Sequence, residues 1–212
     1  MQLYRPPTES SSKRNAPEKA VSEKIAYRIV LFGSKHGVFI DADKELYQYS
    51  YQLLLETLLS WASIFVVGAL FHNLIGTLLF AVFYIPLRVY AGGYHARTFT
   101  GCYWMSITSF VVFSLLIARF APIISNLLFW SVLLTCCAII LFLAPIADQN
   151  KPASVEEYNA FRVKVRKILM FDLGITLLFG IQNIDYDILL YMEFAFLQLS
   201  IQLLIGKLTT SL

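Results

Sequence analysis

The sequence predicts an all-α integral membrane protein with about six transmembrane helices, an N-terminal amphipathic helix at the membrane interface and both termini in the cytoplasm. Three observations lead to this prediction: the apolar composition, the apolar runs of membrane-spanning length, and the placement of the basic residues. Of the 212 residues, 58% are apolar and only 15% are charged, and the mean hydropathy is +0.64. A soluble domain of this size would lack the polar residues needed to cover its surface. The composition therefore excludes most soluble folds and favours lipid as the surrounding medium.

The N-terminal segment predicts a tail followed by an amphipathic helix. Residues 1–20 are rich in proline, serine and charge and contain no apolar run, so they indicate a disordered or tag-like tail rather than a signal peptide. Over residues 21–36, apolar side chains recur at helical spacing and charged side chains occupy the other faces. Such a helix is typical of a membrane interface, and packing against the rest of the chain explains the pattern equally well.

The rest of the chain contains six apolar runs, which are separated by polar or Gly/Pro-containing positions. A helix needs about 20 residues to cross a hydrocarbon core of about 30 Å. The predicted spans are residues 51–70, 73–91, 102–120, 123–147, 168–184 and 188–206. With the amphipathic helix they predict a single membrane-embedded domain over residues 21–212. The boundary at residues 185–187 has a second interpretation, because a re-entrant hairpin produces a similar pattern.

The basic residues are unevenly distributed over this six-span arrangement. Every Lys and Arg except Arg119 falls on the side of the two termini. Cytoplasmic loops of membrane proteins carry an excess of Lys and Arg. The pattern therefore predicts a multi-pass protein with both termini and the 92–101 connection in the cytoplasm.

The stretch RVYAGGYHARTFTGC, residues 88–102, carries residues that a purely structural role explains poorly. Arg88 lies at the rim of an apolar run, where a cation must snorkel to the surface, form a pair or line a wet cavity. Gly92 and Gly93 break the helix and permit backbone conformations closed to residues with a Cβ. Taken alone, Arg88 is equally well explained as a membrane anchor and the two glycines as a turn.

His95 and Cys102 add reactive groups to this turn. A cysteine needs a base or a positive field to become a thiolate at neutral pH, and an imidazole is the usual base. On one straight helix the two residues would be about 10 Å apart along the axis, too far for proton transfer at about 3 Å. If they act together, the chain must break between them so that Cys102 enters the next helix beside His95. Taken separately, a cysteine at a helix start is also explained as a small buried apolar residue, and a histidine at the membrane interface as a solvated side chain.

This pattern resembles the accessory gene regulator B family, AgrB, whose members are membrane cysteine endopeptidases of Gram-positive quorum sensing. The resemblance rests on Arg88, Gly93, His95 and Cys102 at their spacing. It also includes LAPIADQNKP, residues 143–152, which is similar to a proline and lysine-proline loop of the family. With the six spans, the resemblance covers about residues 20–206.

The resemblance implies a function and a set of partners. Cys102 would be the nucleophile and His95 its general base, with Arg88 and Gly93 in supporting roles. Beyond the resemblance, the backbone N–H groups near Gly92 and Gly93 or the Arg88 guanidinium are candidates to stabilise the oxyanion. The substrate would be an AgrD-like pro-peptide, cleaved at its C-terminal side through an acyl-enzyme thioester. The product would be a thiolactone or lactone precursor of an autoinducing peptide. A homodimer in the bacterial cell membrane is also implied. The distribution of the basic residues predicts that its active site faces the cytoplasm.

Other polar residues are candidates for supporting roles. Glu56 and Asp172 lie about one turn inside predicted cytoplasmic span ends, so each is a candidate partner for His95 or Arg88. Each is also explained as a protonated or snorkelling side chain, and Glu193 lies nearer the outer side. The connection at residues 148–167 predicts contact with anionic lipid or binding of an acidic pro-peptide region. Its four candidate substrate-binding cations are Arg162, Lys164, Arg166 and Lys167.

The main alternative function is a small membrane transporter or exporter of a peptide, because intramembrane Arg, Asp and Glu often mark a translocation path. Against it, the sequence lacks the paired broken segments of an inverted repeat. We expect no metal and no cofactor, because the histidines are scattered and no HExxH motif occurs. Nucleic-acid binding has no support, since no nucleic-acid motif accompanies the basic residues. Cys136 and Cys137 are expected to pack within an apolar span.

Overall fold

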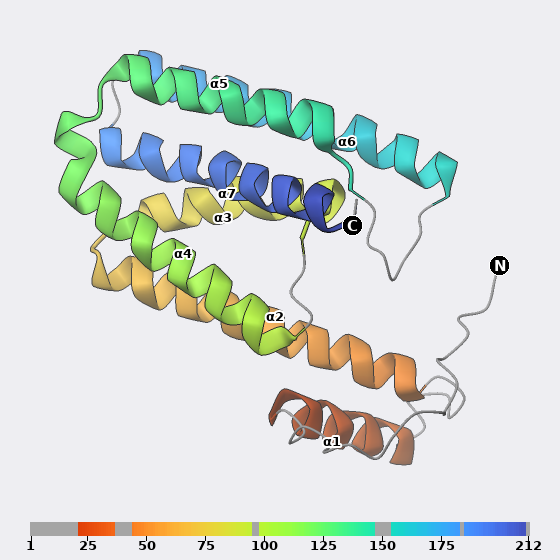
Figure 1. Ribbon diagram of the computed structural model, residues 1–212. Coiled ribbons are helices and arrows are strands. Elements are labelled where there is room, and N and C mark those ends of the chain that lie inside the picture. Colours follow the sequence, from red (N-terminus) through yellow and green to blue (C-terminus); the bar gives the residue numbers. More distant parts are fainter. Residues whose placement is uncertain (1–20, 37–43, 95–97, 147–153, 183–184, 211–212) are drawn as a thin grey trace. The chain divides into compact units, whose positions relative to one another are not determined.

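The structure, a computed structural model, describes residues 21–36, 44–94, 98–146, 154–182 and 185–210. Its elements are α1 (Val21–Lys35), α2 (Lys44–Leu70), α3 (Leu74–Ala91), α4 (Phe99–Phe120), the 3-10 turn η2 (Ala121–Ile123), α5 (Asn126–Leu143), α6 (Val155–Ile181) and α7 (Tyr186–Thr210) (Figure 1). The described residues contain no β-strand and one isolated bridge, between Gly92 and Ile146. The predicted all-α class is confirmed, and the predicted tail at residues 1–20 lies outside the described residues.

Two compact units divide the chain within α2, after residue 59. The first unit contains α1 and the start of α2. α1 buries Ala26 and Val30, whereas Ile25, Ile29 and Phe32 are exposed. The helix predicted over residues 21–36 is therefore present and amphipathic. Its exposed apolar face is suited to lipid, and the interfacial position stays a prediction.

α7 lies at the centre of the second unit. It packs mainly against α3 and α5, and α3 also packs against α6 (Figure 1). Aromatic rings join the helices: Phe194 of α7 stacks on Phe80 of α3 with ring centroids 4.9 Å apart and on Phe113 of α4 at 3.9 Å. Most side chains of α7 are buried. This helix therefore provides the surface on which its neighbours assemble.

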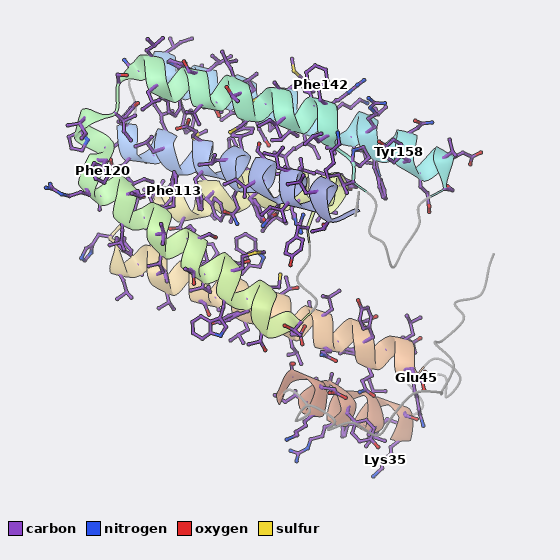
Figure 2. All side chains as sticks on the ribbon, in the orientation of Figure 1. Lys35, Glu45, Phe113, Phe120, Phe142 and Tyr158 are labelled. Atoms are coloured by element: carbon purple, nitrogen blue, oxygen red, sulfur yellow. The ribbon has the colours of Figure 1, made fainter. Side chains whose placement is uncertain are left out.

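Among the residues that the structure describes, five helical segments are long and apolar enough to cross a membrane. They are α2, α3, the segment from residue 100 to 123 that contains most of α4, α5 and α7. Their outward side chains suit lipid: Phe142 of α5 is 82% exposed and lies on the outer side of the helix (Figure 2). The fifth predicted span, 168–184, falls mostly in α6, where several charged residues lie close to the apolar part, and residues 183–184 lie outside the described residues. The six-span count and the orientation stay predictions.

Several helices begin or end at other residues than predicted, because side-chain caps determine where they start. α4 begins directly after Thr98, whose Oγ1 accepts from the Gly101 N–H at 3.2 Å, so this helix starts before the predicted residue 102. α5 begins after Ser125, which caps it in the same way, and ends before Pro145. The predicted span at 123–147 is therefore too long at both ends, because apolar composition does not register caps.

The prediction of a loop over residues 148–167 is wrong from residue 155 onward, because α6 begins at Val155. Ser154 and Glu157 form a capping box: Ser154 Oγ accepts from the Glu157 N–H at 3.2 Å, and Glu157 Oε2 accepts from the Ser154 N–H at 3.0 Å. Two donors at the helix end are thereby satisfied. The four candidate substrate-binding cations consequently lie on a helix rather than in a loop.

Candidate active site

Two glycines end α3 and turn the chain. Gly92 has φ +67° and ψ −138°, and Gly93 has φ +110°, conformations that residues with a Cβ rarely adopt. The turn is also crowded: a Cβ on Gly92 would collide with the carbonyl oxygen of Ile146, and a Cβ on Gly93 would lie 2.6 Å from Arg88 Nη1. Conformation therefore favours glycine at both positions, backbone crowding also requires it at Gly92, and a Cβ on Gly93 would displace the Arg88 guanidinium.

The Arg88 guanidinium closes this turn from the last turn of α3. Its Nη1 donates to the Gly92 carbonyl oxygen, and its Nη2 donates to the Tyr94 carbonyl oxygen at 2.6 Å. A guanidinium presents several donors in one plane, which suits two carbonyls on neighbouring residues. Arg88 thus clamps residues 92–94, a contact that a purely snorkelling anchor would not make.

Two further segments hold the turn. On one side, Ile146 pairs with Gly92 in the isolated bridge, and its N–H donates to the Ala91 carbonyl at 2.9 Å. On the other side, the Tyr94 N–H donates to the carbonyl of Gln202 on α7, also at 2.9 Å. The start of the predicted 143–152 loop therefore packs against the glycine turn, while residues 147–152 lie outside the described residues.

α7 approaches this turn without an intervening side chain. A Cβ on Gly206 would lie 2.8 Å from the Tyr94 backbone nitrogen and 3.2 Å from the Gly93 carbonyl carbon. Both distances are shorter than normal van der Waals contact. The turn is thus held between Arg88, the segment at Ile146 and the C-terminal part of α7.

Cys102 lies in the first turn of α4. Its N–H donates to the Thr98 carbonyl at 3.1 Å, while the Thr98 side chain caps the same helix end. The thiol is free and half-buried. The start of a helix carries partial positive charge, which stabilises a nearby anion. Cys102 therefore occupies a position that suits a reactive thiol.

The chain breaks between the two predicted catalytic residues, as their cooperation requires. α3 ends at Ala91 and α4 begins at Phe99, so no continuous helix joins residues 95 and 102. His95 follows directly after Tyr94 but lies outside the described residues. Its pairing with Cys102 therefore stays a prediction.

Tyr84 and Gln202 are polar residues of this site that the sequence analysis missed. The Tyr84 hydroxyl donates to Gln202 Oε1 at 2.7 Å. One signal was visible in advance: Tyr84 precedes Arg88 by four residues, so the two share a helix face. The partnership with Gln202 was invisible, because the two residues are 118 positions apart.

The candidate acidic partners have different environments. Glu56 belongs to the first unit, where it accepts hydrogen bonds from Ser22 Oγ at 2.9 Å and Gln52 Nε2 at 2.8 Å. Asp172 on α6 and Glu193 on α7 are buried, and in the described part of the chain one carboxylate oxygen of each lacks a hydrogen-bond partner. No described contact joins either of these two residues to Arg88, whose guanidinium bonds to backbone carbonyls. A partner for His95 stays a prediction.

The basic first half of α6 lies beside the end of α3. Lys164 Nζ sits 4.7 Å from the centre of the Tyr90 ring, and Tyr90 also packs against Phe161 with ring centroids 5.8 Å apart. Tyr90 is two residues from Arg88. The structure thus brings Lys164, one of the four predicted substrate-binding cations, next to the helix that bears the clamp, with Arg162 half-buried and Arg166 and Lys167 exposed on the same helix.

Cys136 and Cys137 are buried in α5, away from any helix start. The Cys136 carbonyl accepts a hydrogen bond from Ser200 Oγ of α7 at 3.1 Å, which ties the two helices together. These thiols belong to the hydrophobic core of the second unit, in line with the packing role expected from the sequence.

The family model "Accessory gene regulator B" matches residues 22–205. The chain belongs to the accessory gene regulator B (AgrB) family. It is 25% identical over 146 residues to "Putative AgrB-like protein" of Clostridium perfringens (strain SM101 / Type A), a match that covers 66% of this chain. The match spans 64% of that relative's length. No solved structure matches the chain significantly. Family membership and the apolar helices together identify a membrane protein.

Proposed function

We propose that this member of the AgrB family is a membrane cysteine endopeptidase that cleaves an AgrD-like pro-peptide and cyclises it for quorum sensing. One observation carries the proposal. The chain holds residues 92–94 in a clamped glycine turn immediately before His95, and it restarts as a helix whose first turn contains Cys102. A Cys–His site needs a base and a thiol that are not on one straight helix, and the described residues on either side of His95 meet this condition.

In the proposed reaction, His95 accepts the Cys102 proton and the sulfur attacks one peptide carbonyl of the bound pro-peptide. The C–N bond breaks, the leaving amine takes a proton from His95, and the C-terminal part of the substrate departs. The N-terminal part remains bound to Cys102 as a thioester.

A thiol or hydroxyl within the substrate then attacks this thioester and releases Cys102. The product is a cyclic thiolactone or lactone. Exchange of one thioester for another conserves the reactive bond, whereas hydrolysis would lose it. A site at the membrane rim favours the tethered nucleophile by limiting water and by holding the two reacting groups close together.

Arg88 has a positioning role in this mechanism. Its guanidinium donates to the Gly92 and Tyr94 carbonyls, so it sets the direction in which the chain enters His95. Arg88 does not bind the oxyanion of the tetrahedral intermediate in this mechanism; the start of α4 does. The N–H groups of Gly101 and Cys102 already bond to Thr98. The N–H groups of Phe99 and Thr100 in the first turn have no acceptor within the helix, so they donate to the oxyanion. Such donors contribute about 3 kcal/mol to transition-state stabilisation.

The basic first half of α6 is the proposed docking surface for an acidic region of the pro-peptide. Lys164 contacts Tyr90 at the end of α3, near the clamp. The substrate's apolar part lies along the membrane, and the active site faces the cytoplasm. In this arrangement the peptide reaches Cys102 from the lipid surface.

The test is co-expression with a cognate pro-peptide, comparing the wild type with Cys102→Ala, His95→Ala and the control Cys136→Ala. Cleavage and cyclic product are measured by mass spectrometry. We expect both site variants to lose processing and the Cys136→Ala protein to retain it, because Cys136 is a core residue of α5. Undiminished processing by Cys102→Ala would refute the proposal.

A further inference from the structure

The first half of α4, which carries Cys102, buries little of its surface against the rest of the second unit. None of the described side chains from residue 100 to residue 109 is buried. By contrast, Phe110 is 1% exposed and packs on Phe80 of α3 with ring centroids 5.2 Å apart. The core therefore fixes the second half of α4, and individual contacts determine the position of the first half.

One such contact joins α4 to α2 directly beside the thiol. Tyr103 follows Cys102 in the chain, and its hydroxyl lies 2.8 Å from Ser63 Oγ, a hydrogen bond in which either oxygen can donate. Both side chains are half-buried, and the start of α4 lies beside α2 (Figure 1). Hydrogen bonds between side chains stabilise contacts between helices in membranes. Because residues 102 and 103 share a peptide bond, this contact also restrains Cys102.

Ser63 has a fixed position because the second half of α2 packs closely on α3. The Trp61 ring contacts the Tyr84 ring of α3 with centroids 6.3 Å apart. A Cβ on Gly68 would collide with Thr77 Oγ1, so the two helices approach each other without space for a further side chain. All of these residues belong to the second unit. Since α3 ends in the clamped glycine turn, Ser63 is held in place relative to that turn.

We propose that Ser63 and Tyr103 form a tether that positions Cys102 relative to the end of α3, an inference that rests on the proposed function. The tether acts on the start of α4 and not on the reacting atoms, so Ser63 and Tyr103 are positioning residues. Without it, the first half of α4 moves more freely, and the thiol is less often placed to attack a bound peptide carbonyl. Binding of the substrate to α6 is left intact.

Four variants of the full-length protein in anionic liposomes test this tether. Tyr103→Phe and Ser63→Ala each remove one oxygen of the hydrogen bond, and a double variant removes both. Ser63→Thr keeps the hydroxyl and is the conservative replacement. Tyr49→Phe and Ser109→Ala are the matched controls. Tyr49 is 66% exposed on α2, and the Ser109 hydroxyl donates within its own helix, to the Ser106 carbonyl at 2.9 Å.

Two measurements separate a positioning role from a general folding defect. The first is hydrogen–deuterium exchange of the backbone amides, read by mass spectrometry on peptides from residues 100–109 and 110–120. The second is the split of pro-peptide processing into kcat and KM. Exchange needs no substrate, so it tests the tether even if the protein processes no pro-peptide and the proposed function fails.

We expect Tyr103→Phe and Ser63→Ala to exchange faster over residues 100–109 and at the wild-type rate over residues 110–120, which the core holds. Each should lower kcat about fivefold with little change in KM, as the loss of one hydrogen bond predicts. The double variant should lose no more activity than either single variant, because the same bond is lost in all three. Ser63→Thr should keep the wild-type kcat.

The inference is overturned if Tyr103→Phe has wild-type exchange over residues 100–109. It is also overturned if the losses of the two single variants multiply in the double variant, because the two hydroxyls would then act independently. A fall in kcat for Tyr49→Phe or Ser109→Ala as large as that for Tyr103→Phe would have the same consequence.

Discussion

At the scale of single residues, the turn after α3 depends on matched chemistry between one arginine and two glycines. Gly92 and Gly93 adopt positive φ and leave room for neighbouring backbone and the guanidinium. Arg88 then donates to the carbonyls that this turn exposes. Each of the three residues needs the other two, so a substitution at any of them disturbs the same short segment before His95.

Arg88→Lys tests whether the clamp depends on geometry or on charge. An ammonium keeps the positive charge but lacks the planar fork that bonds two carbonyls together. We expect pro-peptide processing to fall at least about tenfold, as the loss of a charge-assisted hydrogen bond predicts. Processing is measured by product formation in membranes with equal amounts of enzyme.

Arg119→Lys is the matched control, because Arg119 lies in the last turn of α4, at the opposite end from Cys102. It should retain full processing. Wild-type activity of Arg88→Lys would show that charge alone is sufficient at this position, contrary to the clamp.

Much of this site was predictable from local sequence, and its long-range partners were not. Arg88, Gly92, Gly93 and Cys102 lie within one stretch of sequence whose chemistry is visible without a structure. Gln202 was missed because its role comes from tertiary contacts with that stretch. In the sequence it is one polar residue among apolar neighbours, which local patterns do not distinguish from a packed amide.

At the scale of elements, α7 is both the core of the second unit and a wall of the candidate site. Its buried middle packs against α3 and α5, while its C-terminal part contacts the glycine turn. Hydropathy predicted this helix as an ordinary span, 188–206. Its central position could not be read from apolar composition, because every span in such a protein is apolar.

Gly206→Ala tests the close approach of α7 to the turn. The added Cβ would lie 2.8 Å from the Tyr94 nitrogen, so the turn must shift by a few tenths of an ångström or more. We expect processing to fall about tenfold while the helical circular dichroism signal remains, because small displacements at an active site lower rates strongly.

Gly174→Ala provides the control for the same substitution on α6. No heavy atom outside the immediate chain neighbourhood lies within 4 Å of a Cβ built there. Alanine also favours a helix over glycine. This variant should process the pro-peptide normally, and equal losses in both variants would argue against a specific contact at Gly206.

The basic first half of α6 predicts a second element-scale result. Replacing Arg162, Lys164, Arg166 and Lys167 by glutamine should weaken pro-peptide binding to protein in anionic liposomes and lower its salt dependence. Binding is measured by fluorescence anisotropy of a labelled pro-peptide. Unchanged binding would remove α6 from substrate recognition and leave lipid contact as the role of these cations.

The start of α6 also shows why element boundaries were harder to predict than element types. The capping box of Ser154 and Glu157 was present in the sequence, but the charged residues after it indicated a loop. Local hydrogen bonds at the helix start favour helix despite this polarity. Apolar runs identified the helices, and caps determined where they begin.

At the scale of the whole molecule, the apolar runs and the distribution of basic residues predict six crossings with cytoplasmic termini, whereas five helical segments of the described residues are long and apolar enough to cross. α6 decides between five and six, because its first half is basic and its second half is apolar. If α6 crosses the membrane, residues near its two ends lie on opposite sides. The exposed apolar side chains support a membrane setting. Whether α6 crosses the membrane is decided by the side on which its two ends are labelled.

Thiol labelling of intact cells makes this measurement. In a background with Cys102→Ser, we expect a membrane-impermeant maleimide to label Asn126→Cys and Gln182→Cys from outside. Glu156→Cys should be labelled only after the membrane is permeabilised. All three positions are exposed side chains. Labelling of Glu156→Cys and Gln182→Cys on the same side would show that α6 does not cross.

The central claim is that Cys102 carries the substrate as a thioester before cyclisation. The most direct measurement is mass spectrometry of the protein mixed with a pro-peptide whose internal nucleophile is replaced by alanine, which slows release of the intermediate. We expect the Cys102 peptide to gain the mass of the N-terminal substrate fragment. This adduct should be removed by hydroxylamine and absent from Cys102→Ala and His95→Ala. Cleavage of the pro-peptide with no adduct on Cys102, and equal cleavage by Cys102→Ala, would show that Cys102 does not carry the substrate.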